Sequence, residues 1–279
     1  MRTIDPAIVR FTPQHLGGAV RLSREAGWPH RPEDWQLALT VSEGFVAIGD
    51  TGAVVGTILL TAYGRDCATI NMVIVDRAAR GRGLGRRLMD AALDLAGDRP
   101  LRLVATDEGL PLYERLGFRA TGTIVQHQGV VSEVAPPETT EDAAAADIPA
   151  IAALDRMAFG ADRGALIERL AAVGTFAVIR RGGQVAGYAA MRSFGRGEVV
   201  GPVVASALAD AETLISHFMS RRRSSFLRVD TAVDPGLAPW LAGKGLAHVG
   251  GGIAMARPLV EIAAARSVTT FALANQALG

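Results

Sequence analysis

Residues 73–88 read VIVDRAARGRGLGRRL, and this stretch constrains the fold of the chain more than any other. A β-branched run leads through a short polar connection and glycines at 81, 83 and 85 into apolar residues at helical spacing. The pattern predicts a strand, a glycine-rich loop and an amphipathic helix. Glycines let backbone N–H groups turn toward one point, where the positive end of the helix dipole adds to them. With Arg80, Arg82 and Arg86 nearby, the loop is expected to bind a phosphate or pyrophosphate.

Length and composition indicate a folded protein of two domains. The chain has 279 residues, of which 49% are apolar and 20% are charged, so each half can bury a core of its own. No apolar run approaches the roughly 20 residues of a membrane span, and the N-terminal residues lack the apolar core of a signal peptide. The single cysteine, Cys67, cannot form an internal disulfide. These features predict a cytoplasmic protein.

The charge balance argues against a dedicated nucleic-acid binder. The formal net charge is +1, whereas nucleic-acid-binding domains are strongly basic. Of the 29 Lys and Arg residues, all except Lys244 are Arg, which is typical of a G+C-rich bacterial genome and identifies no partner. Residues 221–223, three consecutive arginines, are expected to form a solvated helix end. The five histidines show no metal-ligand spacing, so no metal site is predicted.

The first half of the chain predicts a helix, a sheet meander and then alternating strands and helices. Thr12 and Pro13 mark the start of a helix that ends near Gly27. The loop that follows contains Trp28 and Trp35, which either line a ligand site or cover the core. Strands are predicted at residues 45–48, 54–60, 68–75, 101–105 and 118–128, with a short helix at 109–116.

The pattern of the first half starts again after residues 132–140, which interrupt every periodicity and predict a linker. The strand, turn and strand between Phe45 and Gly56 recur between Phe176 and Gly187 at one constant spacing. The second half is therefore expected to repeat the fold of the first.

The repeat also predicts that the second half has lost the phosphate-binding loop. If Val203 takes the place of Val73, residues 210–216 fall opposite residues 80–86. That segment holds no glycine and has two acidic residues in place of two arginines, so it would repel a pyrophosphate. The predicted fold class is α/β (α+β). Residues 1–131 form the domain with the site, 132–140 the linker, and 141–279 a copy without the site.

Two motifs resemble signatures of the GNAT superfamily of N-acetyltransferases. Residues 80–85, RGRGLG, are similar to its phosphate-loop pattern, and residues 112–118, LYERLGF, are similar to its second signature. This resemblance covers roughly residues 1–130. The whole chain also resembles a bacterial two-domain subgroup, in which a Gly-Trp to Asp-Trp loop, here residues 27–35, precedes a degenerate GNAT-like domain. The resemblance implies tandem GNAT folds, each a mixed central sheet flanked by helices.

Other interpretations of the glycine loop fit less well. A dinucleotide-binding fingerprint needs a third glycine where the chain has Arg86, and it needs the first glycine directly after the strand. A nucleoside-triphosphate loop needs Gly-Lys-Ser/Thr, which is absent. A glycine-rich turn without a ligand stays open.

The family resemblance implies acetyl-CoA as cosubstrate. Backbone N–H groups of the loop would hold its pyrophosphate, and the preceding strand would pair with the pantetheine amides and polarise the thioester carbonyl. Tyr113 would protonate or hydrogen-bond the departing thiolate. The implied cofactor-binding residues are Val73, Ile74, Val75, Arg80, Gly81, Arg82, Gly83, Leu84, Gly85 and Arg86.

The acceptor side is less defined in the sequence. The position at which some family members carry a catalytic Glu holds Thr69, which cannot act as a base. Glu25, His30, Asp34 and His127 are candidate bases, and water acting on an already neutral amine is another solution. Substrate contacts are expected at Trp28, His30, Trp35 and Asn71.

Two functions of different classes fit these residues. One is an acetyl-CoA-dependent N-acetyltransferase that moves an acetyl group to a primary amine of a small molecule or peptide, by direct attack on the thioester. The other is a non-catalytic acyl-CoA-binding regulator, which the missing base favours. The second domain would wall the acceptor site or mediate a homodimer, and a ligand site of its own near residues 201–204 and 271–279 stays open. Nucleic acid and membrane are not expected as partners.

Overall fold

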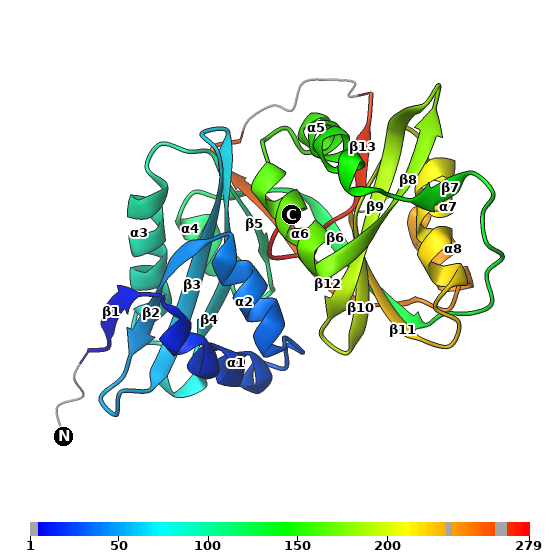
Figure 1. Cartoon of the computed structure of the whole chain (residues 1–279). Helices are drawn as coiled ribbons and strands as arrows, with labels where there is room; N and C mark the ends of the chain where they lie inside the picture. The colour runs from blue at the N-terminus through cyan, green and yellow to red at the C-terminus, as the bar shows by residue number, and fades with distance from the viewer. Residues whose placement is uncertain (1–4, 233–235, 260–266) are drawn as a thin grey trace.

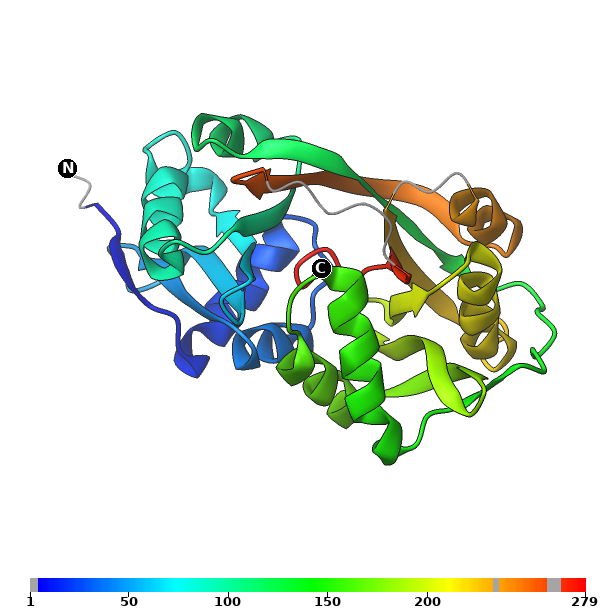
Figure 2. The same cartoon turned by 90° about the horizontal axis from the view of Figure 1, so that it is seen from above.

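The computed structural model describes residues 5–232, 236–259 and 267–279, which form two lobes that share one 13-stranded mixed sheet (Figures 1 and 2). Strands β6 (Arg119–Val130) and β12 (Ala247–Arg257) run across both lobes. The first lobe contains β1 (Ala7–Arg10), a 3-10 helix (Pro13–His15), α1 (Leu16–Glu25), α2 (Pro32–Thr40), β2 (Glu43–Ile48), β3 (Val54–Tyr63), β4 (Cys67–Val75), a 3-10 helix (Arg77–Ala79), α3 (Leu84–Ala96), β5 (Leu101–Ala105) and α4 (Leu110–Arg115). The second lobe contains β7 (Thr140–Asp142), a 3-10 helix (Ala145–Asp147), α5 (Ile148–Phe159), α6 (Gly164–Val173), β8 (Gly174–Arg181), β9 (Gln184–Phe194), β10 (Gly197–Ala205), α7 (Leu208–Ser220), β11 (Phe226–Ala232), α8 (Leu237–Gly243) and β13 (Thr269–Ala272).

Each lobe buries its part of the sheet on both faces, because alternate residues of a strand point to opposite sides. In β3, Ile58 and Leu60 pack with α3 in one core, whereas Leu59 between them packs with α1 and α2 in another. In β8, Ile179 packs with α7, and Val178 beside it packs with α5 and α6. The structure confirms the predicted mixed sheets flanked by helices.

The two lobes exchange one strand each. β12, from the second half of the chain, lies beside β5 of the first lobe with Arg257 opposite Leu101. β6, from the first half, lies beside β11 of the second lobe with Val130 opposite Phe226. β6 and β12 also pair with each other where they cross the molecule together (Figure 2). The chain divides into two repeats, but neither lobe completes its sheet with its own half of the chain.

Strand β4 diverges from its neighbour β5. Their parallel pairing ends at Thr69, opposite Arg102. A β-bulge then shifts the register of β4 against β3, and Met72 within it has a φ of 51°, in the left-handed region that few non-glycine residues adopt. In the described part of the chain, residues 73–75 therefore have no ladder partner on the side of β5.

The second lobe repeats this divergence between β10 and β11, but there a strand fills the gap. β10 and β11 pair at Glu198 and Val199, and β13 then inserts between them. Ala272 of β13 lies opposite Val203 on one side and opposite Thr231 on the other. Val203 corresponds to Val73 in the sequence repeat. The second lobe thus holds an extended peptide in the gap that the first lobe leaves open.

One detail of the predicted repeat is wrong. Residues 210–216 form no loop opposite residues 80–86, because they lie inside α7. Residues 76–83 connect β4 to α3, whereas residues 206–207 alone connect β10 to α7. Packing indicates that Leu214 of α7 corresponds to Leu88 of α3. Leu88 lies over Gly56, and Leu214 lies over Gly187, which takes the place of Gly56 in the repeat. The second lobe lacks the whole loop, not only its glycines and arginines.

Within the described residues, no helix combines the length and apolar character that crossing a membrane requires. Residues 1–4, which belong to the stretch considered for a signal peptide, lie outside the described residues.

Candidate active site

A cleft of about 780 Å³ opens where β4 and β5 diverge, and we call it the β4–β5 cleft. It is bounded by the unpaired end of β4, the glycine loop, the start of α3, residues 106–109 after β5, and α4. The sequence predicted most of this lining, because strand, loop and helix are contiguous in the chain. Of the predicted cofactor-binding residues, those that line the cleft are Val73, Ile74, Val75, Arg80, Gly81, Gly83, Leu84 and Gly85.

The glycine loop and the start of α3 form one end of the cleft. Gly81 and Gly83 have φ values of 75° and 78°, and Gly83 is the N-cap of α3. A Cβ at either position would meet nothing within 4 Å, so packing does not require glycine there. The backbone conformation does require it. The first N–H groups of α3 have no carbonyl partner inside the helix, and together with the helix dipole they favour an anion.

Two of the three predicted arginines do not reach the cleft. Arg80 lines it and pairs through Nη1 with Glu108 at 3.0 Å. Arg82 is exposed on the loop and is not part of the lining. Arg86 pairs with Asp90 at 2.8 Å along the surface of α3, because residues four apart are neighbours on a helix. Contacts of Arg82 and Arg86 with a ligand in the cleft therefore stay a prediction, because neither side chain is part of the lining.

Tyr113 lines the β4–β5 cleft from α4. Its ring packs edge-on against Phe118 and lies over Gly109, where a Cβ would come within 2.8 Å of the ring. Burial raises the pKa of Tyr113 to about 12, so the phenol keeps its proton at neutral pH. Because a thiol has a pKa of about 8.5, this phenol is better suited to donate a hydrogen bond to a thiolate than to transfer its proton.

A cavity of about 300 Å³ lies between the lobes, and we call it the interlobe cavity. The first lobe lines it with residues 27–30 and with residues 70–72 of β4, and the second lobe lines it from the β9–β10 turn and from β11. Trp28 and Thr106 line both the cavity and the β4–β5 cleft, and β4 passes from one to the other after Met72. A ligand in the interlobe cavity would therefore adjoin a ligand in the cleft.

The interlobe cavity brings together three of the four predicted acceptor residues, namely Trp28, His30 and Asn71. Trp35 is wrong as a substrate contact. It lies in the first turn of α2 and faces the core, where its ring is fully buried and its Nε1 donates to Ser23 Oγ at 2.8 Å. The second tryptophan of the loop therefore anchors α2 to α1 instead of contacting a ligand.

Of the four candidate bases, only His30 lines either space among the described residues. Glu25 lies at the exposed end of α1 and pairs with Arg21 at 2.7 Å. Asp34 is engaged in the ion pairs described below. His127 is buried in β6 between two residues that line the cavity, so its side chain points to the opposite face of the sheet.

We expect His30 to remain neutral through the pH range of activity. Burial is the main cause that lowers the pKa of His30 to about 4; Arg228 and Arg192 lower it further, and Asp34 opposes them. The kcat/KM profiles of the wild type and of His30→Gln should therefore have the same shape between pH 5 and 8. An inflection near pH 6.5 that disappears in His30→Gln would show instead that His30 titrates as a base.

The same pKa predicts how stability depends on pH. The unfolded chain binds a proton at His30 near pH 6.5, whereas the folded chain binds it only near pH 4. Lowering the pH through this window therefore favours unfolding. The Tm of the wild type should fall more between pH 7 and 5 than the Tm of His30→Gln.

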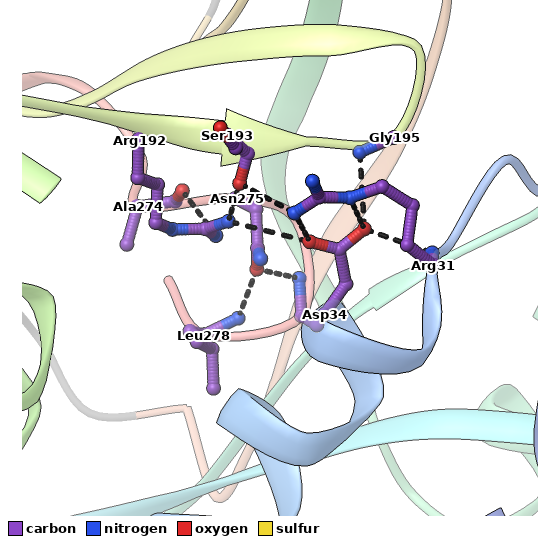
Figure 3. Close-up of polar contacts among 9 residues, drawn as sticks. Arg31, Asp34, Arg192, Ser193, Gly195, Ala274, Asn275 and Leu278 are labelled. Carbon is purple, nitrogen blue, oxygen red and sulfur yellow. Dashed lines mark hydrogen bonds and ion pairs between the residues drawn. The ribbon is translucent and has the colours of Figure 1, made fainter. Parts of the chain in front are cut away.

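A buried carboxylate ties the loop before α2 to the second lobe (Figure 3). Asp34 accepts hydrogen bonds from the Arg31 side chain at 2.8 and 3.1 Å and from the Gly195 N–H at 3.0 Å, and it lies 3.9 Å from Nη1 of Arg192. Burial acts to raise the pKa of Asp34, but the hydrogen bonds outweigh it and hold the pKa below its usual value. Arg192 also donates to the carbonyl oxygen of Ala274. We call Arg31, Asp34, Arg192 and Gly195 the interlobe cluster, and this cluster fixes one wall of the interlobe cavity.

The sequence did not predict the residues that the second lobe adds to the cavity. Phe194 and Arg196 flank the β9–β10 turn, and the glycines at 195 and 197 between two apolar strands are a turn signal that locates them. Residues 275–277 belong to the stretch 271–279 that was considered for a ligand site of the second domain, and they line the cavity between the lobes instead. Arg228 carries no comparable signal. A single arginine in a strand of an arginine-rich chain looks like any surface residue.

The fold and the β4–β5 cleft together define an acyltransferase. A model of the acetyltransferase (GNAT) family matches residues 17–118, and a model of an acetyltransferase (GNAT) domain matches residues 151–266. The chain is 30% identical over 233 residues to the uncharacterized N-acetyltransferase YitH of Bacillus subtilis (strain 168). The aligned region covers 80% of this chain and 81% of that protein. The chain belongs to the GNAT family of acetyltransferases, and its two halves are two GNAT domains.

Solved structures show the same fold. A Pyrococcus horikoshii protein has a TM-score of 0.83 at 18% identity, with 100% of this chain and 98% of that chain covered. A tandem GNAT protein from the clavulanic acid biosynthesis pathway has a TM-score of 0.63 at 16% identity, with 90% of this chain and 97% of that chain covered. A GCN5-related N-acetyltransferase from Sphaerobacter thermophilus has a TM-score of 0.57 at 18% identity, with 91% of this chain and 98% of that chain covered. At these identities the likeness concerns the fold alone.

Proposed function

We propose that this protein is an acetyl-CoA-dependent N-acetyltransferase that acts on a primary amine. The observation that carries the proposal is that one cleft joins the glycine loop, the unpaired end of β4 and Tyr113. In this proposal residues 1–131 form the catalytic domain, 132–140 the linker and 141–279 a domain that frames the acceptor site. Family members use acetyl-CoA, and the lining of the β4–β5 cleft suits that molecule.

The residues of the cleft fit the three parts of acetyl-CoA. The glycine loop and the start of α3 would hold the pyrophosphate through backbone N–H groups. Residues 73–75 would pair with the pantetheine amides, as a strand pairs with an added strand. The second lobe supports this, because the equivalent gap between β10 and β11 takes up the extended strand β13. The same occupation of that gap leads us to expect one acetyl-CoA site per chain.

The proposed chemistry takes place where β4 passes from the interlobe cavity to the cleft. A neutral amine in the cavity would form the nitrogen–carbon bond to the thioester carbonyl, while a backbone N–H of residues 73–75 stabilises the oxyanion. The carbon–sulfur bond then breaks, and the thiolate leaves beside Tyr113, which donates a hydrogen bond to it. The surplus proton of the nitrogen passes to water, because His30 is too weak a base.

A panel of amines tests the proposal against the regulator alternative. Thiol release from acetyl-CoA is measured for each amine, and acetyl-CoA binding is measured in parallel by calorimetry. We expect thiol release with some amines and binding with a stoichiometry of one. Binding without thiol release from any amine would overturn catalysis and leave the acyl-CoA-binding regulator. The absence of binding would overturn both.

The glycine loop gives a direct test of the cosubstrate site. The variant Gly83→Ala places a Cβ in open space but at a φ of 78°, and we expect it to raise the Kd for acetyl-CoA about tenfold or more. Gly64→Ala is the matched control, because Gly64 has a φ of 60° with open space at its Cβ, and it lies in the β3–β4 turn outside the cleft. Equal Kd values for both variants would show that the loop does not hold the cosubstrate.

A further inference from the structure

We propose that the acceptor amine carries a carboxylate, and that Arg196 and Arg228 of the second lobe bind this carboxylate in the interlobe cavity. The inference rests on the proposed function, because it names the class of amine that the first lobe acetylates. It gives the second lobe a role in choosing the substrate.

The charge of the cavity lining carries the inference. Among the described residues that line the cavity, Arg196 and Arg228 are cationic and none is Asp or Glu. His30, which also lines it, is neutral at neutral pH. A diamine or polyamine would bring a second positive charge toward two arginines. An amine with a carboxylate brings the opposite charge, which two arginines in the lining favour.

Arg228 is held in position before any ligand binds. Its Nε lies 3.0 Å from both carboxylate oxygens of Asp230, its Nη2 lies 2.8 Å from Asp230, and its guanidinium lies over the ring of Phe194 at 5.1 Å. The side chain is only 11% exposed, and that of Asp230 is 0% exposed. Asp230 therefore fixes the edge of the guanidinium that carries Nε and Nη2. A guanidinium carries further N–H donors on its other edge, in a fork that matches a carboxylate.

Arg196 supplies the charge that Asp230 does not balance. It is exposed in the β9–β10 turn, and within the described residues it forms no ion pair. Its turn is fixed to the first lobe, because the neighbouring Gly195 donates its N–H to Asp34. The cavity is thus lined by the fixed guanidinium of Arg228 on β11 and by Arg196, whose turn is held in place by the interlobe cluster.

The position of the two arginines also fits the place of the proposed chemistry. An acceptor whose carboxylate binds at the second-lobe wall places its amine toward β4 and the cleft. A volume of about 300 Å³ is at the lower end for small-molecule sites, which suits an acceptor on the scale of an amino acid.

The test compares amino acids with the amines that lack only the carboxylate, such as phenylalanine with phenethylamine and lysine with 1,5-diaminopentane. Thiol release from acetyl-CoA gives kcat/KM for each. For the amino acid with the highest kcat/KM, we expect the wild-type kcat/KM to exceed that of the decarboxylated partner at least 30-fold. Arg196→Gln should lower kcat/KM for that amino acid about tenfold or more, and for the decarboxylated amine less than twofold.

Two further variants separate carboxylate binding from loss of folding or of charge. Arg223→Gln is the matched control, since it removes an exposed arginine of the second lobe that pairs with Glu133, outside the cavity. It should change neither rate. Arg228→Lys keeps a cation against the buried Asp230 but loses the fork, and we expect it to raise KM for the amino acid with little change in kcat.

The outcomes distinguish this inference from the proposed function. If amines are acetylated but the decarboxylated partner is as good as its amino acid, the inference fails and the proposed function stands. If no amine is acetylated, the proposed function fails, and calorimetric titration of the amino acids in the presence of CoA decides the binding site. Amino-acid binding that Arg196→Gln weakens would support the site, and equal or absent binding would overturn it.

Discussion

Replacing Tyr113 with Phe is expected to lower kcat about 100-fold and to leave the affinity for acetyl-CoA unchanged. The phenol lines the β4–β5 cleft and keeps its proton, because burial raises its pKa to about 12. It can therefore stabilise a departing thiolate by a hydrogen bond that the bound thioester needs much less. Removing one hydrogen-bond donor to a developing negative charge typically costs about 10²- to 10³-fold, and we expect the lower end because a thiolate is a good leaving group. Steady-state kcat at saturating amine and calorimetric Kd are the measurements.

A second hydroxyl deletion controls for changes in folding. Tyr63 donates from its buried hydroxyl to the carbonyl oxygen of Leu278, and it lines neither the β4–β5 cleft nor the interlobe cavity. Tyr63→Phe should lower the Tm and leave kcat per folded molecule unchanged. If Tyr113→Phe retains the wild-type kcat, Tyr113 has no role in the departure of the thiolate.

Replacing Asp34 with Ala is expected to reduce the free energy of unfolding by about 3–5 kcal/mol, the usual cost of removing one partner from a buried ion pair. The side chains of Asp34 and Arg192 are each 2% exposed. Without the carboxylate, Arg192 is a buried charge close to another arginine, and the Gly195 N–H loses its acceptor. Urea denaturation monitored by circular dichroism measures the loss.

Two comparisons make the Asp34 result specific. Glu25→Ala removes an exposed carboxylate from an ion pair with Arg21 and should cost less than about 1 kcal/mol. Adding Arg192→Met to Asp34→Leu should restore part of the stability, because an apolar pair of similar size leaves no buried charge. A cost below about 1 kcal/mol for Asp34→Ala would mean that the interlobe cluster does not stabilise the fold.

Asp34 also makes the free energy of unfolding depend on pH in the acidic range. Its folded pKa lies below the ordinary value near 4, so its contribution is present above that pH and is lost as the pH falls through the folded pKa. The difference between the wild type and Asp34→Ala should therefore shrink below pH 4.

The sequence predicted the parts of the site that are local in the chain. The strand, loop and helix from residue 73 to 88 are contiguous, and glycine spacing, β-branching and helical periodicity each report on neighbouring residues. The motif that contains Tyr113 is also local, and Tyr113 lines the β4–β5 cleft. The contact predicted for Arg86 stays a prediction, since its side chain pairs with Asp90 along the surface of α3.

The features that the sequence did not predict depend on pairing between distant residues. Periodicity predicts a strand at residues 118–128 but not which strands lie beside it, and no strand is predicted at residues 247–257. The exchange of β6 and β12 was therefore not foreseen. The insertion of β13 between β10 and β11 is equally long-range. Trp35 was misassigned for a related reason, because a loop tryptophan becomes a core residue once α2 packs on α1.

The exchanged strands determine the order in which the molecule can be completed on the ribosome. β5 pairs with residues 253–257, so the glycine loop and Tyr113 emerge long before the sheet beneath them has its neighbouring strand. Until then the nascent first lobe presents an unpaired strand edge, which is prone to aggregate or to bind chaperones. A product truncated between the lobes would carry every residue that lines the β4–β5 cleft on an unfinished sheet. Completion of the sheet of the first lobe is therefore coupled to translation of the second half of the chain.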